Sequence, residues 1–220
     1  MSLNIAEINK EIKFSRLFKR LHYLEQTNST NTNTWDLIEK TNTAGDIVIA
    51  ENQKLGKGRR HNKWFSVPGK SLTFSFSITL PKSEKTSLLS LIAGVSIIEV
   101  LNKKINKKIT LKWPNDIYYQ KRKIGGILIE SKKLNKNLNF YVVGIGLNIN
   151  ERKKDFHEKI ANIGTSLKLI SKLTLNREML LSNILLTFEK HILNMDEKYI
   201  VLNWMKHCGH KDEMINFHQN

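Results

Sequence analysis

The alternation of side chains over residues 71–79 constrains the fold of this chain more than any other feature. Leu72, Phe74, Phe76 and Ile78 are apolar, and the residues between them are serine or threonine. Successive side chains of a β-strand point to opposite faces of its sheet, so a period of two predicts a strand with one face in a hydrophobic core. A chain with such a strand has to build a sheet and cover that face.

Segments with a strand pattern and segments with a helix pattern alternate along the chain. Further strands are predicted at residues 21–25, 46–50, 110–113, 124–131 and 138–148. A helix near 35–38 follows a run of Ser, Thr and Asn that can cap it, a second helix spans roughly 84–104, and a third spans roughly 176–195. This order predicts an α+β fold, with a mixed, mainly antiparallel sheet flanked by helices.

The length of 220 residues suits one domain. Cys208 is the only cysteine, so no intrachain disulfide can form, as is usual in a reducing compartment. The N-terminal segment lacks the apolar stretch of a secretory signal, and no apolar run reaches the roughly 18 residues of a membrane span. These features predict a cytoplasmic protein with no membrane contact.

The formal net charge of +16 is a general indication of anionic partners. The lysines, however, are spread over the whole length and do not form one stripe. We therefore interpret most of the charge as compositional. The seven arginines carry more information, because Arg59 and Arg60 are adjacent in a glycine-bearing loop.

That loop runs from Gln53 to Trp64. Gly56 and Gly58 allow a tight turn that presents backbone N–H groups to an anion, and the cations of the loop add the charge that a carboxylate or polyphosphate attracts. The GxxxxGK[ST] spacing of a P-loop is absent. By itself such a loop is also typical of a solvated hairpin.

Two further segments combine strand ends with glycines. Residues 112–117 read Lys-Trp-Pro-Asn-Asp-Ile, and a turn at 115–116 is expected to return the chain directly to the strand that opens at Lys123. Glycines at 125 and 126 let a ligand lie against that strand. Residues 144–150 read Gly-Ile-Gly-Leu-Asn-Ile-Asn, a strand that closes with glycines and an amide. Alone, each feature also fits a surface lysine, a plain turn or a twisted strand end.

Taken in order, these segments resemble the catalytic domain of biotin protein ligases, whose fold is like that of class II aminoacyl-tRNA synthetases. That family shows Ser-Thr-Asn near its start, a Gly-Arg-Gly-Arg-Arg-Gly-Arg-x-Trp loop, Lys-Trp-Pro-Asn-Asp, Lys-x-x-Gly-Ile and a glycine strand ending in Asn. The matching positions are 29–31, 56–64, 112–116, 123–127 and 144–148. The resemblance spans roughly residues 20–205.

The resemblance implies an ATP-dependent ligase that converts biotin to biotinyl-5′-AMP and transfers biotin to a lysine of a biotin carboxyl carrier protein of acetyl-CoA carboxylase. The implied ligands are biotin, ATP and Mg²⁺ carried with the ATP, with no dedicated metal site. The implied biotin-binding residues are Ser29, Thr30, Asn31, Gln53, Lys57, Gly58, Arg59, Trp64 and Lys123. The implied ATP or adenylate residues are Gly56, Lys57, Arg59, Arg60, Asn115, Asp116, Gly126 and Asn148. Lys123 and Arg59 are the implied catalytic residues, because joining a carboxylate to a phosphate requires cations.

Three positions of the basic loop depart from the family pattern. Lys57 stands in place of an arginine, which replaces a bidentate contact with a point charge. His61 stands in place of a glycine and Asn62 in place of an arginine. A positive φ at position 61 would strain a histidine there.

The chain ends also carry expectations. Only about 20 residues precede the first predicted strand, fewer than the roughly 60 of a helix-turn-helix domain, so DNA binding is not expected. Residues 1–205 are assigned to the catalytic domain and 206–220 to a remnant of the family's C-terminal β-barrel, with 211–217 matching at most its first strand. An exposed edge strand that pairs with the carrier could equally form a homodimer.

Two other functions are alternatives to this prediction. Lipoate or octanoate ligases and transferases share the fold, but they typically show Arg-Arg-x-x-Gly-Gly-Gly followed by His, which this chain lacks. A non-enzymatic RNA-binding protein typically has aromatic residues interleaved with basic residues on one face of its sheet. Phe74 and Phe76 instead share one apolar face, as core residues do.

Overall fold

The fold is built on one mixed sheet. The computed structural model describes residues 2–81, 88–134 and 138–210. Within these ranges seven strands form a sheet in the order β1-β2-β3-β7-β6-β5-β4. β1 and β2 are parallel, and all other neighbouring pairs are antiparallel, as predicted. The strands are β1 (Arg20–Thr27), β2 (Asp46–Gln53), β3 (Ser71–Pro81), β4 (Thr110–Lys112), β5 (Asp116–Tyr119), β6 (Arg122–Lys132) and β7 (Leu138–Asn148).

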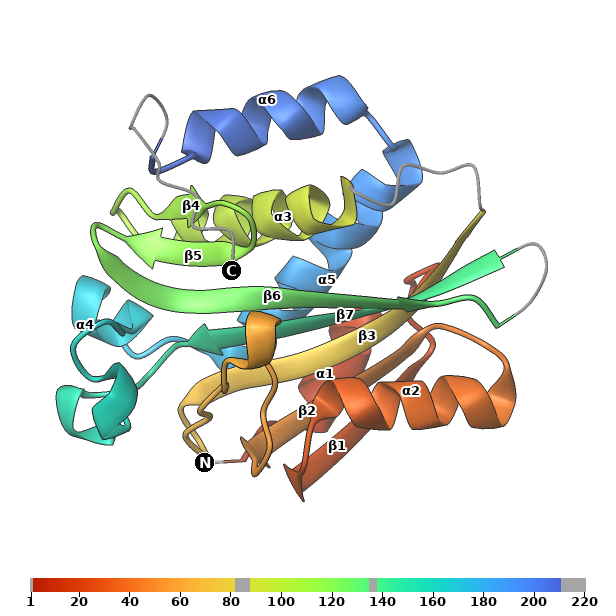
Figure 1. Ribbon diagram of the computed structural model, residues 1–220, viewed down its shortest axis with the longest axis horizontal. Coiled ribbons are helices and arrows are strands. Elements are labelled where there is room, and N and C mark those ends of the chain that lie inside the picture. The colour runs from red at the N-terminus through yellow and green to blue at the C-terminus, as the bar shows by residue number, and fades with distance from the viewer. Residues whose placement is uncertain (1, 82–87, 135–137, 211–220) are drawn as a thin grey trace.

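The helices cover the two faces of the sheet unequally. α2 (Thr30–Thr41) packs on β2, β3 and β7, whereas α3 (Leu88–Lys104) packs on β4, β5 and β6. α5 (Arg177–Asn194) contacts both α3 and α1 (Ile5–Ile12), and α6 (Glu197–His207) covers α3. Figure 1 shows α2 on the near side of the sheet and α1 and α5 on the far side. None of these described helices is both long and apolar enough to cross a bilayer.

Shorter helical segments lie in the loops. The loop between β2 and β3 contains η1 (Arg59–His61). After β7 the chain forms η2 (Lys153–Asp155), η3 (Glu158–Ile160) and α4 (Leu167–Ser171). Figure 1 shows η1 in front of the sheet and α4 at the end where β7 finishes.

The apolar face of β3 lies in the main core, as the alternation predicts. Leu72, Phe74, Phe76 and Ile78 are all buried together with apolar side chains of α3 and α5. The Phe76 ring meets the Phe188 ring of α5 edge to face at a centroid distance of 4.8 Å. Burial of a phenylalanine of this kind stabilises the fold by about 1.5–3 kcal/mol.

The opposite face of the sheet is not filled. Trp35, Ile38, Phe140 and Val142 form a small apolar cluster where α2 covers it. Beyond this cluster the strands carry small residues, because Thr73 pairs with Gly146 and Ser75 with Gly144. Paired residues of an antiparallel sheet point to the same side, so these positions leave a hollow beside the start of α2.

Two parts of the predicted element list were wrong or incomplete. The turn after Pro114 does not lead directly to the strand of Lys123, because the chain first returns as β5 and turns again at Gln120, which has a φ of 53°. Ile117 of β5 is fully buried opposite Gly125, which explains why this short segment is a strand. α1, α4 and α6 were not predicted. Residues 84–87 of the predicted second helix and the predicted strand at 211–217 lie outside the described residues.

Candidate functional site

A cavity with a volume of about 130 Å³ fills the hollow on the α2 side of the sheet. It gathers segments that are far apart in the sequence: the start of α2, the loop after β2, and strands β5, β6 and β7. The predicted residues that line it are Ser29, Thr30, Asn31, Gln53, Lys57, Gly58, Arg59, Trp64, Asn115, Asp116, Lys123 and Gly126.

One end of the cavity is enclosed and polar. The side-chain oxygen of Gln53 accepts a hydrogen bond from the backbone N–H of Thr30 at 2.6 Å, and the Thr30 hydroxyl lies 3.1 Å from the same oxygen. Ser29 occupies the N-cap position of α2 but makes no capping hydrogen bond with its side chain. Its buried hydroxyl therefore remains available to a ligand.

Trp64 forms an aromatic wall of this cavity. Its indole N–H donates to the hydroxyl of Thr73 at 3.0 Å. The ring lies directly over Gly146, where an added Cβ would come within 2.5 Å of ring atom Cε2. A glycine is therefore required at this position of β7 for the indole to lie flat against the strand.

The basic loop closes on itself as a narrow hairpin. Gly58 N–H donates to the carbonyl of Asn62 at 2.7 Å, and Trp64 N–H donates to the carbonyl of Gly56 at 2.9 Å. The left-handed conformation of this loop falls on Arg60, with a φ of 51° and a ψ of 45°. A left-handed backbone, which would strain a histidine at position 61, is therefore found one residue earlier, at Arg60.

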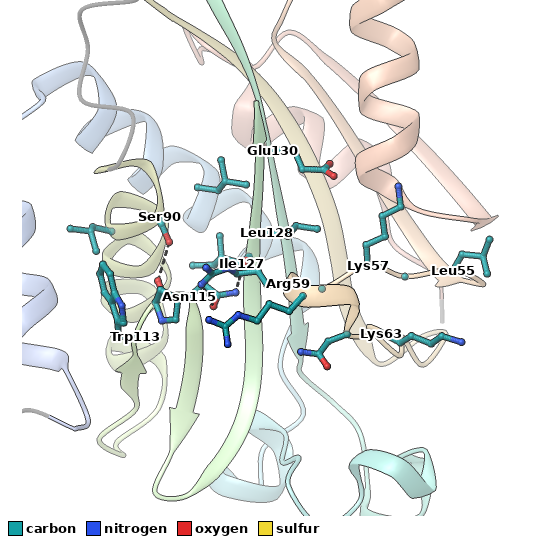
Figure 2. Close-up of a pocket in the computed structure, with 17 residues that line it drawn as sticks. Leu55, Lys57, Arg59, Lys63, Ser90, Trp113, Asn115, Ile127, Leu128 and Glu130 are labelled. Atoms are coloured by element: carbon teal, nitrogen blue, oxygen red, sulfur yellow. Dashed lines mark hydrogen bonds between the residues drawn. The ribbon is translucent and has the colours of Figure 1, made fainter. Parts of the chain in front are cut away.

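The cations of the loop are exposed and point in different directions. Arg59 reaches across β6 and donates to the side-chain oxygen of Asn115 at 3.3 Å, as Figure 2 shows. Lys57 turns the other way and donates to the hydroxyl of Thr32 in α2 at 3.0 Å. Both side chains are exposed, and their hydrogen bonds of 3.3 and 3.0 Å can be exchanged for contacts with an anion.

A wider cleft, with a volume of about 840 Å³, opens outward from the cavity. Lys57, Gly58, Arg59, Asn115 and Ile127 line both spaces, so the two are continuous. In Figure 2 the cleft extends from Leu55 and Lys57 on one side to Ser90 and Trp113 on the other. An enclosed polar pocket that leads into an open basic cleft suits a ligand with a compact polar head and an anionic group at its other end.

Lys123 lies at the junction and is paired. Its ammonium is 2.5 Å from a carboxylate oxygen of Asp116, and its side chain is 33% exposed. The backbone of Lys123 is held by Ile163 and Thr165, through bonds of 2.7 and 2.8 Å. Asp116 thus holds the lysine in place, a role in addition to the predicted contact with the nucleotide.

Three predicted residues lie elsewhere. Gly56 and Arg60 line the outer cleft but not the inner cavity. Asn148 lines neither space: it is buried at the end of β7, and its amide donates to the carbonyl of Thr165 at 3.0 Å. That bond ties the end of β7 to a residue that lies just before α4.

Several lining residues were not predicted. The cavity also includes Asn62, Lys63, Thr73, Ile127, Leu128, Gly144, Ile145 and Gly146. The cleft also includes Leu55, Ser90, Leu91, Trp113, Pro114, Ile129 and Glu130. Thr73 could have been found from the alternation of β3, which places its hydroxyl on the face away from the core. Ser90 and Leu91 carry no such signal, because their position depends on how α3 packs.

Comparisons with known proteins identify relatives of this chain. Residues 23–148 match the model of the biotin/lipoate A/B protein ligase family. The bifunctional ligase/repressor BirA of Bacillus spizizenii is 30% identical over 190 residues, which are 86% of this chain and 58% of that protein. The biotin--[acetyl-CoA-carboxylase] ligase of Mycobacterium tuberculosis is 28% identical over 185 residues, or 80% of this chain and 65% of that protein. The chain thus spans less than two thirds of the length of these curated relatives.

A solved structure supports the same relationship. The biotin protein ligase from Aquifex aeolicus in complex with biotin and ATP superposes with a TM-score of 0.74 and 31% identity, covering 88% of this chain and 80% of that one.

Proposed function

The chain belongs to the biotin/lipoate A/B protein ligase family, among the biotin protein ligases, and from this membership we propose that it activates biotin with ATP and transfers it to a lysine of a biotin carboxyl carrier protein. The observation that carries the proposal is the enclosed polar end of the cavity. A ureido ring has N–H donors and a carbonyl acceptor, which the side chains of Ser29, Thr30 and Gln53 complement. The dithiolane ring of lipoate has no such groups and would leave these buried polar atoms without partners.

The apolar part of biotin fits the rest of the cavity. Its thiophane ring and tail need an apolar wall, and the Trp64 indole over Gly146 supplies one. The tail would then direct the carboxylate towards Lys123 and into the basic cleft. The distance from the polar end to the cations sets the length of acid that the site accepts.

The residues at the junction have to bring two anions together. A carboxylate oxygen of biotin attacks the α-phosphorus of ATP, the bond to the pyrophosphate breaks, and biotinyl-5′-AMP and pyrophosphate result. We assign Lys123 to the carboxylate and α-phosphate, where charge accumulates, and Lys57, Arg59 and Arg60 to the phosphates. Gly126 lies beside Lys123, so the strand leaves room for the ligand there.

Mg²⁺ would supply further neutralisation of the phosphate oxygens when it enters with ATP. Within the described residues, no group of three or more His, Cys, Asp or Glu side chains is placed to hold a metal ion. The carboxylates that line the described cavity and cleft are Asp116 and Glu130, and both are engaged by neighbouring side chains. The phosphates of the substrate would hold most of such an ion, and Asp116, a carboxylate that lines the cavity, would be able to contribute an oxygen ligand.

In the second step the neutral amine of the carrier lysine attacks the acyl carbon of the adenylate. The amide bond forms, AMP leaves, and the amine gives up its proton. The carrier must approach the outer cleft, which exposed Lys and Arg side chains surround, so an acidic carrier domain is the partner we propose.

The test uses the purified chain and a biotin carboxyl carrier domain. Incubation with biotin and Mg·ATP should add one biotin to the carrier, as measured by intact mass, and omission of ATP should abolish the addition. Lipoate in place of biotin should give no product, and calorimetry should show binding of biotin without comparable binding of an RNA oligonucleotide. Transfer of lipoate in preference to biotin would refute the assignment.

A further inference from the structure

A chain of hydrogen bonds leads from the buried polar end of the cavity to the half-buried Glu130 on β6. One carboxylate oxygen of Glu130 accepts from the side-chain amide of Asn31 at 2.8 Å and from the indole N–H of Trp35 at 3.2 Å. Glu130 lines the outer cleft but not the inner cavity, and Figure 2 shows it on the cleft side of β6 beyond Leu128. It therefore acts on the cavity only through other residues.

The chain continues inward from Asn31. Ser75 donates its hydroxyl proton to the side-chain oxygen of Asn31 at 2.6 Å. The hydroxyls of Ser75 and Thr30 are also 2.6 Å apart, and Thr30 faces Gln53. Asn31, Ser75 and Thr30 are buried, with exposed fractions of 4%, 0% and 3%, so their hydrogen bonds have to be made within the protein.

Glycine at position 144 makes the chain geometrically possible. A Cβ at Gly144 would come within 2.1 Å of the side-chain oxygen of Asn31. The amide of Asn31 thus lies flat on β7, between Ser75 of β3 on one side and Glu130 of β6 on the other.

The proton directions along this chain follow from Glu130. An ionised carboxylate only accepts, so the NH₂ group of Asn31 must face it and the oxygen of Asn31 must face Ser75. Ser75 donates its only hydroxyl proton to that oxygen, so its own oxygen can only accept from the Thr30 hydroxyl. Thr30 then directs its proton to Ser75 across 2.6 Å in preference to Gln53 across 3.1 Å. The outward lone pairs of Thr30 are left to accept from a ligand.

We propose that Glu130 is a positioning residue that determines specificity, because it orients Asn31 and Ser75 so that Thr30 presents a hydrogen-bond acceptor to a ureido N–H of the ligand. This inference rests on the proposed function and adds a residue outside the ligand contacts. Gln53 completes the pattern, since its oxygen is occupied by the Thr30 N–H and only its amide donors remain. The pocket therefore offers the ligand one acceptor, on Thr30, and donors on the Gln53 amide, in fixed positions.

The competing explanation is that Glu130 only anchors α2 through Trp35. Two variants separate the roles. Trp35→Phe removes the indole bond and leaves the bond to Asn31, whereas Glu130→Leu removes both. Glu130→Gln can turn its oxygen towards both donors and should preserve the proton directions.

The experiment compares the affinities of two ligands for each purified variant by calorimetry. The ligands are biotin and its cyclic carbamate isostere, in which a ring oxygen replaces the ureido N–H. Wild type should prefer biotin strongly. In Glu130→Leu, Thr30 can reorient, so the ratio of the two dissociation constants should fall by about tenfold, as expected when one buried donor–acceptor match is lost. In Glu130→Gln and Trp35→Phe the ratio should stay within about threefold of wild type.

The ratio of the two dissociation constants distinguishes a positioning role of Glu130 from an anchoring role. An unchanged ratio in Glu130→Leu, or an equal fall in Glu130→Gln, overturns the proposal, because loss of helix anchoring would weaken both ligands alike. If Glu130→Leu does not give a cooperative melting curve, Asn31→Leu breaks the same chain one residue further in and must lower the ratio. Failure of wild type to bind biotin would instead refute the proposed function.

Discussion

On one face of β3 the side chains of Leu72, Phe74, Phe76 and Ile78 are buried in the main core, while on the other face each serine or threonine from 71 to 77 has a specific hydrogen-bond partner. Ser77 accepts from backbone N–H groups at the start of β2, Ser75 contacts the start of α2, and Thr73 contacts Trp64. Ser71 donates to Glu151 at 2.6 Å. The two faces of one strand therefore differ in what they supply: the apolar face supplies stability through packing, and the hydroxyl face supplies placement of the site residues.

The largest expected effect on stability lies on the apolar face. Phe76→Ala leaves a cavity between β3 and the rings of Phe18 and Phe188, and should lower the free energy of unfolding by about 3–5 kcal/mol. Denaturant unfolding measures the loss. Biotin affinity at a temperature where the variant is folded should remain close to that of wild type. A large drop in affinity in the folded variant would mean that the two faces are not independent.

The largest effect on the hollow side should appear in rate and not in stability. Lys123→Ala removes the cation at the junction and leaves Asp116 without its partner. Adenylate formation in a single turnover should slow by about 10²-fold to 10³-fold, by analogy with other preorganised charge-stabilising groups. Biotin binding should persist in weakened form.

The matched control is Lys121→Ala, which replaces an exposed lysine of the neighbouring turn that lines neither the cavity nor the cleft. A rate within about threefold of wild type would make Lys123 a surface residue.

The contrast between the faces also explains what sequence could and could not predict. The apolar half of β3 was predicted from its period of two, and most residues that line the inner cavity were expected from the resemblance, because many of them sit in fixed motifs. Glu130 was not predicted, since a single glutamate carries no signal until the sheet brings β6 beside β7. The alternation of β3 gave the face of Ser75 but not its partner Asn31, and the position of Ser90 depends on how α3 packs. β5 was missed because its four residues lie between two turns, and only its pairing with β6 makes it a strand.

At the end of the hydroxyl face, Glu151 should make stability depend on pH. It is fully buried, and burial raises its pKa from 4.5 to about 7, while the bond from Ser71 opposes that rise. The folded state thus holds this proton more tightly than the unfolded chain. The stabilising contribution is present below about pH 4.5 and is lost as the pH rises through about 7.

Glu151→Gln, which stays neutral, should therefore be more stable than wild type above pH 7, by on the order of 1–3 kcal/mol, and similar to it near pH 4.5. Chemical denaturation across this pH range measures the difference. Glu158→Gln, on the exposed η3 segment, should show no such divergence from wild type. A constant difference between Glu151→Gln and wild type at all pH values would show that Glu151 does not titrate in this range.

The smallest expected effect distinguishes two hydroxyls on the same face. Thr73→Val keeps the volume of the side chain but removes the acceptor for the Trp64 indole N–H, which is 3.0 Å away. The indole would then bury a donor without a partner, and its orientation over Gly146 would be less well fixed. One such bond contributes about 1 kcal/mol, so biotin affinity should weaken about fivefold.

Ser77→Ala removes an acceptor for the N–H groups of Gly45 and Asp46, away from the cavity. It should lower the melting temperature and leave biotin affinity unchanged. Calorimetry and melting curves on both variants test the distinction, and equal affinities in Thr73→Val and wild type would show that the hydroxyl at 73 does not hold the tryptophan in its binding position.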